Sequence, residues 1–533
     1  MVKAARARKR PNILPNILPN ILVVMFDQMA ALSLPSYGHP VVKAPNFDRL
    51  AKRGTLFENA YCTAPLCSPS RFGMLTGQLP SRFGAYDNAA ELPAEIPTFL
   101  HHLRNAGYRT CLSGKMDFTG ADQLHGFEER LTTDLSPSDF GWVPDWEHPD
   151  EVQSWFHSLH SVAEAGPCDY SLSLQYDEDA CDRGIDWLQQ IVGEKGDRPF
   201  MLTVSVMQPH DPYQGLRKFW DLYDPAEIDM PAEPKRKAGR RNAVEARMHR
   251  LYDRDEIKLS SRQIRDARRA YYAMISYCDD LLGRLLRTLE IAGVADDTMV
   301  IVTSDHGDML GERGLWYKMN FYDRAIRVPL IVAGPGIKRG QRVRQAVSQL
   351  DLLPTLLDFC GDRIARDGLD GVSLWPSLAR GVAPKGELVG EYCGEGYDAP
   401  VIMIRRGRHK FVHGRGLETE LYDLDADAGE LRNLTREPDA RALVEALTAE
   451  AETRWDLDGL RDRVIASQRR RRLAHQALVT GRVAAWDYAP RMDAAAVYYR
   501  NYDPNLPDPD RVLRRPGPTL GPTPGPSRKR GGA

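Results

Sequence analysis

Two pairs of polar side chains that suit a metal ion follow long apolar runs in the sequence. Asp27 and Gln28 come directly after the run Asn20–Phe26, and Asp305 and His306 end a second run of the same kind. Carboxylate and amide oxygens together with one imidazole are ligands that a divalent cation accepts in proteins. The alternative is that each pair only caps the helix after its strand. Polar and charged residues crowd the segment after Asp305, which favours one divalent cation held by these four side chains.

A cysteine with unusual neighbours stands ahead of a stretch that predicts a helix. It is Cys67, the first residue of the segment Cys-Ser-Pro-Ser-Arg that ends at Arg71. The commonest role of such a residue is an inert buried thiol. A second alternative is a thiolate nucleophile with a histidine partner, but no signature of that kind surrounds it. Arg71, on the first helical turn, and the helix N-terminus itself would both favour a bound anion.

Two further polar residues stand near these segments. His210 ends a third apolar run, and Lys318 lies in an otherwise aromatic stretch. Taken alone, a lysine or histidine is more often a surface residue or one with a satisfied structural role. Close to a nucleophile and a cation, the same side chains would act on developing negative charge.

The segments that must position these residues alternate between strands and helices. The runs that predict buried parallel strands are Asn20–Phe26, Pro199–Tyr213 and Thr298–Asp308. The segments that predict helices, with apolar residues three and four apart, are Ile96–Gly107 and Ala267–Gly293. This alternation predicts an α/β fold, with a large, mixed but mostly parallel sheet sandwiched by helices. Ligands gather at the carboxyl ends of strands in such sheets, so Asp27, His210 and Asp305 are expected to lie together.

The pattern changes after about residue 380. Short strands separated by turns, followed by a helical segment, predict a smaller C-terminal α+β subdomain with an antiparallel sheet. The last residues are rich in proline and glycine and predict a disordered tail. The predicted parts are a repeat-containing lead-in at 1–19, the catalytic domain at 20–380, the subdomain at 381–480, an extension for oligomer contacts at 481–512 and the tail at 513–533.

Composition limits the class of protein. The chain has 533 residues and a net charge of −2, with 71 Lys+Arg against 73 Asp+Glu. This balance gives no reason to expect a nucleic-acid partner. The eight cysteines are scattered and form no C-x-x-C pair, which favours a reducing compartment. The N-terminus makes a poor signal peptide and no run reaches the length of a membrane span, so we expect a cytoplasmic protein with no membrane partner.

The segment at Cys67 resembles the C-x-P-S-R signature of the type I sulfatases, in the alkaline phosphatase-like superfamily. The resemblance implies that a formylglycine-generating enzyme oxidises Cys67 to formylglycine. One hydroxyl of the hydrated aldehyde would attack the sulfur of a sulfate ester, and the second would expel the sulfate. It also implies that the modified Cys67 joins the metal ligands. Lys115, His210 and Lys318 would bind sulfate oxygens or protonate the leaving alkoxide, and Arg71 would hold the diol. The metal is expected to be Ca²⁺, with Mn²⁺ or Mg²⁺ as alternatives.

Longer stretches resemble the choline sulfatases within that family. They include "SRFGAYDNAAELPAEIPTFLHHLRNAGYRTCLSGKMDF", "QPHDPY" and the late segment "WDYAPRMDAAAVYYRNYDPN". The resemblance implies a small sulfate ester with a quaternary ammonium head, a substrate pocket that includes Asn88, Trp142 and His157, and a homo-oligomer, dimer or tetramer. Two residues depart from the family pattern. Asp117 stands in place of a histidine that would contact the sulfate, and Ser158 in place of an amide in the head-group pocket. An anionic side chain beside a sulfate is costly, so either Asp117 turns away or the substrate differs.

Two other functions fit the same residues. A phosphonate monoester or phosphodiester hydrolase would use the same formylglycine and metal ligands, because its substrate also carries one negative charge. A non-catalytic binding homologue would keep the fold but not the reaction, either because Cys67 stays a thiol or because Asp117 makes the pocket unsuitable for catalysis.

Overall fold

The computed structural model describes residues 18–482 apart from 137, 152, 154, 195–197, 234, 253–256 and 362–367. The predicted lead-in, extension and tail lie outside the described residues, except for residues 18, 19, 481 and 482. Their roles, and the predicted domain boundaries, stay predictions.

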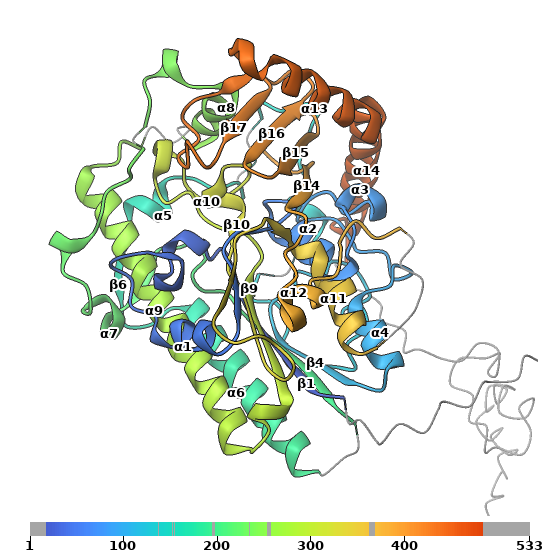
Figure 1. Cartoon of the computed structure of the whole chain (residues 1–533). Coiled ribbons are helices and arrows are strands. Elements are labelled where there is room, and N and C mark those ends of the chain that lie inside the picture. The colour runs from blue at the N-terminus through green and yellow to red at the C-terminus, as the bar shows by residue number, and fades with distance from the viewer. Residues whose placement is uncertain are drawn as a thin grey trace, which may run out of the picture. The chain divides into compact units, whose positions relative to one another are not determined.

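An eight-stranded sheet forms the centre of the chain (Figure 1). Its strands, in spatial order, are β12 (Gln341–Val343), β2 (Thr55–Phe57), β11 (Leu330–Ala333), β9 (Thr298–Ser304), β1 (Asn20–Phe26), β7 (Phe200–Val206), β4 (Arg109–Gly114) and β5 (Glu129–Arg130). All neighbouring pairs are parallel except those that β11 makes with β9 and β2. The mixed, mostly parallel sheet predicted from the apolar runs is confirmed.

The register of the three central strands decides where the polar strand ends meet. Phe26 of β1 is aligned with Ser304 of β9 and with Val206 of β7. Asp27 and Asp305 therefore leave the sheet side by side at its carboxyl edge. All seven residues of β7 and of β9 are buried, as expected for strands covered on both faces.

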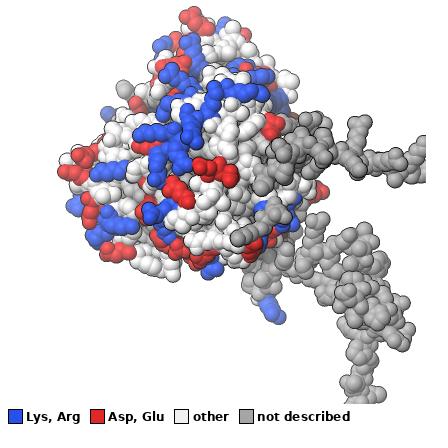
Figure 2. Space-filling view, turned by 60° about the horizontal axis from the view of Figure 1, so that its bottom comes forward, with Lys and Arg blue, Asp and Glu red and all other residues white. Residues whose placement is uncertain are grey.

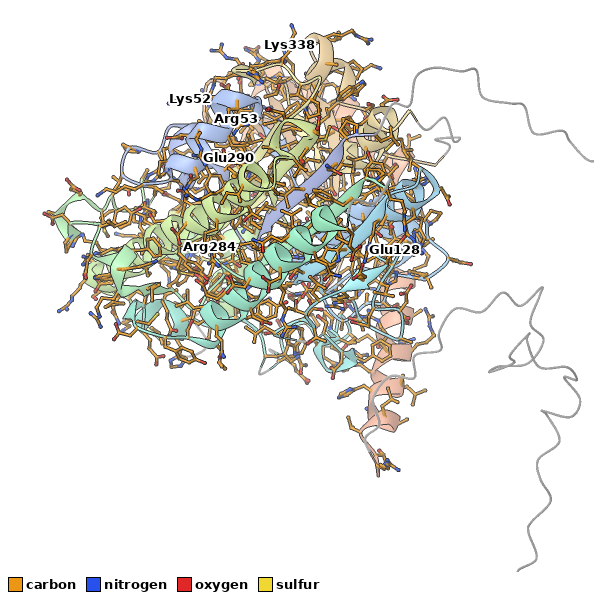
Figure 3. The ribbon with its side chains drawn as sticks, turned by 90° about the horizontal axis from the view of Figure 1, so that it is seen from below. Lys52, Arg53, Glu128, Arg284, Glu290 and Lys338 are labelled. Atoms are coloured by element: carbon orange, nitrogen blue, oxygen red, sulfur yellow. The ribbon has the colours of Figure 1, made fainter. Side chains whose placement is uncertain are left out.

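Helices cover both faces of this sheet (Figure 1). One face carries α1 (Pro45–Arg53), α6 (Leu172–Gly193) and α9 (Ser261–Ile291), and the other carries α2 (Cys67–Thr76), α4 (Phe99–Asn105) and α11 (Leu352–Phe359). Ion pairs link the helices of the first face: Arg53 of α1 lies 3.4 Å from Glu290 of α9 (Figure 3), and Arg284 of α9 lies 2.6 Å from Glu178 of α6.

The two predicted helices start at other residues than expected. The predicted helix Ala267–Gly293 begins at Ser261, because Ser260 and Gln263 form a capping box that the apolar spacing does not reveal. The one predicted at Ile96–Gly107 begins at Phe99, after the capping residue Thr98.

A four-stranded antiparallel sheet follows in the C-terminal part, as predicted. Its order is β14 (Glu387–Tyr392), β15 (Val401–Arg406), β16 (His409–Gly414) and β17 (Glu420–Asp423). Two helices pack with it, α13 (Arg441–Arg454) and α14 (Leu457–Leu478). The ion pair between Arg471 of α14 and the buried Asp87, at 2.6 and 2.8 Å, ties this part to the loop after α3 (Pro80–Phe83). The smaller α+β unit is confirmed.

Short elements complete the chain. Two small sheets pair β3 (Ala60–Tyr61) with β10 (Arg327–Val328) and β13 (Val347–Ser348), and β6 (Gly166–Cys168) with β8 (Gln214–Leu216). The remaining helices are α3 (Pro80–Phe83), α5 (His160–Ala163), α7 (Arg217–Trp220), α8 (Ala243–Tyr252), α10 (Asp323–Ile326) and α12 (Trp375–Arg380). Among the described residues, no helix combines the length and the apolar character that crossing a bilayer requires.

Charge is spread unevenly over the surface. Figure 2 shows one face on which Lys and Arg side chains gather in a band, although the net charge of the whole chain is only −2. Local electrostatics can therefore attract anions even though the balance of the sequence does not.

Candidate active site

Four buried side chains converge at the carboxyl edge of the central sheet. Ligand atoms of Asp27, Cys67, Asp305 and His306 all lie within 4.8 Å of one another. His306 Nε2 is 3.8 Å from Asp27 Oδ1, 3.8 Å from Asp305 Oδ2 and 3.2 Å from Cys67 Sγ. The two strand ends and the start of α2 thus bring together three of the four predicted metal ligands and the predicted nucleophile.

The protonation of this cluster fits a divalent cation. His306 Nδ1 lies 3.0 Å from the carbonyl oxygen of Gly307, to which it donates, so Nε2 carries the free lone pair. Burial lowers the pKa of His306 to about 3, which keeps the imidazole neutral at neutral pH. Burial alone would raise the pKa of Asp27, but Lys115, His210 and Arg71 hold it well below its usual value. Two carboxylates and a neutral imidazole are a donor set for Ca²⁺, Mn²⁺ or Mg²⁺.

Gln28 lies beside this cluster with its side chain engaged elsewhere. Its Oε1 accepts a hydrogen bond from Lys318 Nζ at 2.7 Å, and its Nε2 donates to Asp308 at 2.7 Å. Its φ of 65° is a left-handed conformation that is costly for a residue other than glycine. The fold therefore fixes Gln28 firmly at the site, and its role as a metal ligand stays a prediction.

Cys67 is the first residue of α2, and every residue of this helix is buried. The backbone N–H of Ser68 donates to Asn88 Oδ1 at 3.0 Å, which satisfies one of the free N–H groups of the first turn. Burial, followed by the charge of Asp27, raises the pKa of the Cys67 thiol to about 12. An unmodified thiol in this position is protonated at neutral pH, which argues against the ordinary thiolate nucleophile.

Arg71 binds both carboxylates of the cluster. Its Nε lies 3.0 Å from Asp305 Oδ2, and its Nη2 lies 3.3 Å from Asp27 Oδ2. Nη1 donates to the carbonyl oxygen of Lys115 at 2.8 Å and to Ser205 Oγ at 3.0 Å. Such complete pairing offsets the cost of burying the guanidinium. Arg71 therefore holds the two carboxylates in place, and the predicted contact with a diol is untested.

Two lysines approach the cluster from opposite sides. Lys115 Nζ binds Asp27, and its backbone N–H donates to Ser205 O at 2.9 Å. Gly114 makes this approach possible: its φ is +111°, and a Cβ there would lie 1.8 Å from Ser205 O. Lys318 Nζ lies 2.7 Å from His210 Nε2. Burial, followed by the charge of Lys318, lowers the pKa of His210 to about 4. At neutral pH the lysine is therefore an ammonium that donates a hydrogen bond, and the neutral imidazole accepts it.

Asp117 faces the same lysine and does not turn away from the site. Its Oδ2 lies 3.3 Å from Lys115 Nζ and 3.6 Å from Arg71 Nε. Burial raises the pKa of Asp117 to about 6, against the opposing effects of Lys115 and Arg71. Its φ of 60° is left-handed. The first of the two expectations for this residue, that it turns away, is therefore wrong.

A pocket of about 140 Å³ opens above the cluster. Trp142, Trp155, His157 and Glu395 line it together with eight further side chains and the thiol of Cys67. Those further residues are Asn88, Lys115, Asp117, Ser136, Ser138, Met207, His210 and Lys318. His157 stacks on Tyr317 with 4.4 Å between ring centroids. The pocket thus combines lysines, which can bind an anion, with aromatic side chains.

Comparison with known proteins explains this combination. The family model described as Sulfatase matches residues 19–361, which is more than half of the chain. The choline-sulfatase of Rhizobium meliloti (strain 1021) is 43% identical over 92% of this chain and 96% of its own length. The chain belongs to the sulfatase family. As a member, it is a sulfuric ester hydrolase of a family that implies a divalent metal and a formylglycine-type cysteine.

Other comparisons cover the remaining parts of this sulfatase. The model described as N-sulphoglucosamine sulphohydrolase, C-terminal, matches residues 311–455, and that described as Choline sulfatase enzyme C terminal matches residues 462–514. Mouse arylsulfatase K (Mus musculus) is 27% identical over 75% of this chain and 73% of its own length. The phosphonate monoester hydrolase of Agrobacterium radiobacter has the same fold, with a TM-score of 0.67 and 26% identity over 84% of this chain and 96% of that one.

The sequence analysis missed several residues of this sulfatase's site, of which four have a clear role; Ser136, Ser138 and Met207 also line the pocket. Asp308 and Asp211 fix Gln28 and His210, and Trp155 and Glu395 line the pocket. Glu395 is 6% exposed, and its Oε2 has no hydrogen-bond partner among the described residues. Burial raises its pKa to about 7. Asp211 could have been found as the neighbour of His210, but only the tertiary fold brings Glu395 into the pocket.

Ser158, the second departure from the family pattern, does not line the pocket. Its carbonyl oxygen accepts a hydrogen bond from Tyr317 at 2.6 Å, behind His157. This contact uses the backbone and does not depend on the side chain at position 158.

Proposed function

We propose that this sulfatase hydrolyses choline-O-sulfate to choline and sulfate. The observation that carries the proposal is the lining of the pocket, which combines Lys115 and Lys318 with the aromatic rings of Trp142 and Trp155 and the carboxyl of Glu395. Aromatic faces and a carboxylate attract a quaternary ammonium group, while the lysines attract the sulfate. A volume of about 140 Å³ favours a small ester over an oligosaccharide chain.

The nucleophile in this proposal is formylglycine at residue 67, made from Cys67 by a formylglycine-generating enzyme. When hydrated, it supplies one hydroxyl that attacks sulfur and a second whose deprotonation releases the sulfate. A divalent cation, Ca²⁺ as first choice, would be held by Asp27, Asp305 and His306 with Gln28, and would supply charge stabilisation to the sulfuryl group. The start of α2 places residue 67 where helix N–H groups also favour an anion.

Side chains of this protein bind the sulfate and protonate the leaving group in this proposal. Lys115 and Lys318 hold the sulfate oxygens from two sides. The ammonium of Lys318 donates a hydrogen bond to the neutral His210, which orients the lysine side chain. Lys318 is therefore positioned to protonate the leaving alkoxide. Burial would lower the pKa of Lys318, but Cys67, Asp211 and Asp27 raise it above its usual value. Lys318 is therefore the better proton donor of the pair at neutral pH.

A phosphonate monoester hydrolase is the second candidate, because the Agrobacterium radiobacter enzyme of that name shares the fold. Comparison of kcat/KM for choline-O-sulfate and for a phenyl phosphonate tests the choice. We expect the sulfate ester to be preferred, and a higher value for the phosphonate would contradict the proposal. Low activity on the second substrate is compatible with either function, because both esters carry one charge.

The state of residue 67 separates both enzymes from a non-catalytic homologue. Mass spectrometry of the peptide that contains Cys67, from protein made together with the generating enzyme, should show the loss of one sulfur and two hydrogens and the gain of one oxygen. An unmodified thiol under these conditions would favour the binding homologue. A homo-oligomer, dimer or tetramer, is proposed as well, and the mass of the full chain in solution tests it.

A further inference from the structure

A second hollow lies apart from the active-site pocket and shares none of its lining residues. Its volume is about 710 Å³. It lies where the loop after β2, the loop before β13 and the turn before β14 meet the turn between β15 and β16. Its charged lining residues are Glu58, Arg344, Lys385, Arg405, Arg408 and Asp425. Four cations against two carboxylates leave the hollow with an excess of positive charge.

Arg405, which lines this hollow, is a buried cation with unpaired hydrogen-bond donors. The residue is only 5% exposed, and its Nε and Nη1 have no hydrogen-bond acceptor among the described residues. Burial of a guanidinium is expensive unless its donors are paired. Native proteins leave few buried donors unpaired, and such donors commonly mark a bound water or ion. Arg405 is one of the residues that line the hollow. Its Nε and Nη1 are themselves covered, so the guanidinium acts on a ligand in the hollow through its positive charge.

The neighbouring carboxylates are already engaged. Asp323, whose pKa Arg405 helps to lower, binds Lys410 Nζ at 2.7 Å and the hydroxyl of Tyr61 at 3.1 Å. On the rim, Glu58 Oε1 lies 2.7 Å from Arg342 Nε. The acids near Arg405 therefore have cationic or hydroxyl partners of their own, and none of them accepts a hydrogen bond from Nε or Nη1 of Arg405 among the described residues.

The other cationic side chains of the hollow lie at its rim, exposed to solvent. The side chain of Arg344 is 86% exposed and that of Arg408 is 59% exposed, with Arg408 Nε 3.3 Å from Asp423. Exposed cations at the rim and one buried guanidinium suit a ligand with an oxyanion at one end. A hollow of this volume lies within the range of small-molecule sites, about 300–1,000 Å³, and exceeds the size of an inorganic anion.

We propose that this hollow binds a small organic molecule through an oxyanion group, a phosphate or a carboxylate, held by the charge of Arg405. The positive charge of the guanidinium attracts such a group, with Lys385, Arg344 and Arg408 around it. The ligand is not the substrate of the active site, because the two cavities share no residue. The proposal is therefore independent of the nature of the reaction.

Isothermal titration calorimetry with inorganic phosphate and with citrate tests this site on the full chain. The active site also has lysines for anions, so each titration is made in the wild type and in Lys318→Ala. We expect one class of anion site to remain in Lys318→Ala and to weaken at least tenfold in Lys318→Ala/Arg405→Met. Binding of phosphate alone or of citrate alone supports the site and identifies the group, phosphate or carboxylate, that it takes.

Arg406→Met is the matched control in the same background. Arg406 follows Arg405 on β15, but its side chain is 44% exposed and pairs with Glu387 and Glu450. The control removes the same charge from the opposite face of the strand and should leave binding unchanged. If Arg405→Met fails to fold, the exposed pair Arg344→Met/Arg408→Met replaces it, with the same loss expected. Absence of binding in Lys318→Ala, or equal losses in the Arg405 and Arg406 variants, would overturn the proposal.

Discussion

Asp117 Oδ2 lies 3.3 Å from the ammonium of Lys115, inside the pocket that also contains residue 67. A sulfate group placed against Lys115 must share this lysine with a carboxylate. The ionised carboxylate repels the sulfate and competes for the same donor, whereas the protonated form does neither. We therefore predict that Asp117 limits anion binding in this sulfatase in a way that the histidine expected from the family pattern would not.

Replacement of Asp117 by asparagine should raise kcat/KM for the sulfate ester about tenfold at pH 8, because one negative charge leaves the pocket. The pKa of Asp117 is raised by burial to about 6, so the wild type should gain activity as the pH falls through 6 and this carboxyl takes up its proton. Asp117→Asn should lack that gain. The measurement is kcat/KM against pH for both proteins.

Asp122→Asn is the control for this prediction. Asp122 lies in the same loop, but its carboxylate accepts backbone hydrogen bonds from Leu124 and His125 and does not line the pocket. Its pH profile should match the wild type. An Asp117→Asn variant with the wild-type profile would show that Asp117 does not control anion binding.

Lys318→Ala should lower kcat for an alkyl sulfate by about 10³ and for an aryl sulfate with a good leaving group by only about tenfold, since general acid catalysis supplies 10²–10⁴. The reason is that Lys318 donates the proton which an alkoxide needs and a phenolate does not. Steady-state kinetics with choline-O-sulfate and 4-nitrophenyl sulfate measures the difference. Equal losses on the two substrates would mean that Lys318 binds sulfate only.

Glu395→Gln should raise KM for choline-O-sulfate about tenfold and leave KM for butyl sulfate, which has no cationic head, unchanged, because a carboxylate in a desolvated pocket favours a cation by a few kcal/mol at most. Its pKa is raised by burial to about 7, so the preference for choline should strengthen as the pH rises through 7 and Glu395 ionises. KM values for the two esters at pH 6 and pH 8 check both statements. Asp398→Asn, an exposed change in the same loop, should alter neither.

The fold could be predicted from the sequence where the signal is local. Continuous apolar runs gave the bounds of β1 and placed Asp27, His210 and Asp305 at one edge, because parallel strands end together. The predicted first residue of a helix was wrong where a capping side chain sets the start of that helix, as Ser260 does for α9. Capping depends on one side chain and leaves no periodic trace.

The site could be predicted only in part. Residues that end strands or follow a motif were found, such as His306 and Cys67. Glu395 and Trp155 were not, because they reach the pocket from segments whose place depends on tertiary packing. The direction of Asp117 was equally open in the sequence, since a left-handed φ and two cationic neighbours in space fix it.

Removal of the divalent cation should destabilise the protein as well as stop the reaction. Asp27 and Asp305 each lie 3.8 Å from His306 Nε2, and only the folded chain brings these three side chains together. A cation that binds them therefore stabilises the folded state. Ligand at 100 times its dissociation constant stabilises a fold by about 2.7 kcal/mol, so EDTA should lower Tm measurably, and Ca²⁺ or Mn²⁺ should restore it. His306→Gln should show a low Tm that the metals raise much less. A Tm that neither EDTA nor added metal shifts in the wild type would rule out a cation at these residues, whatever the state of residue 67.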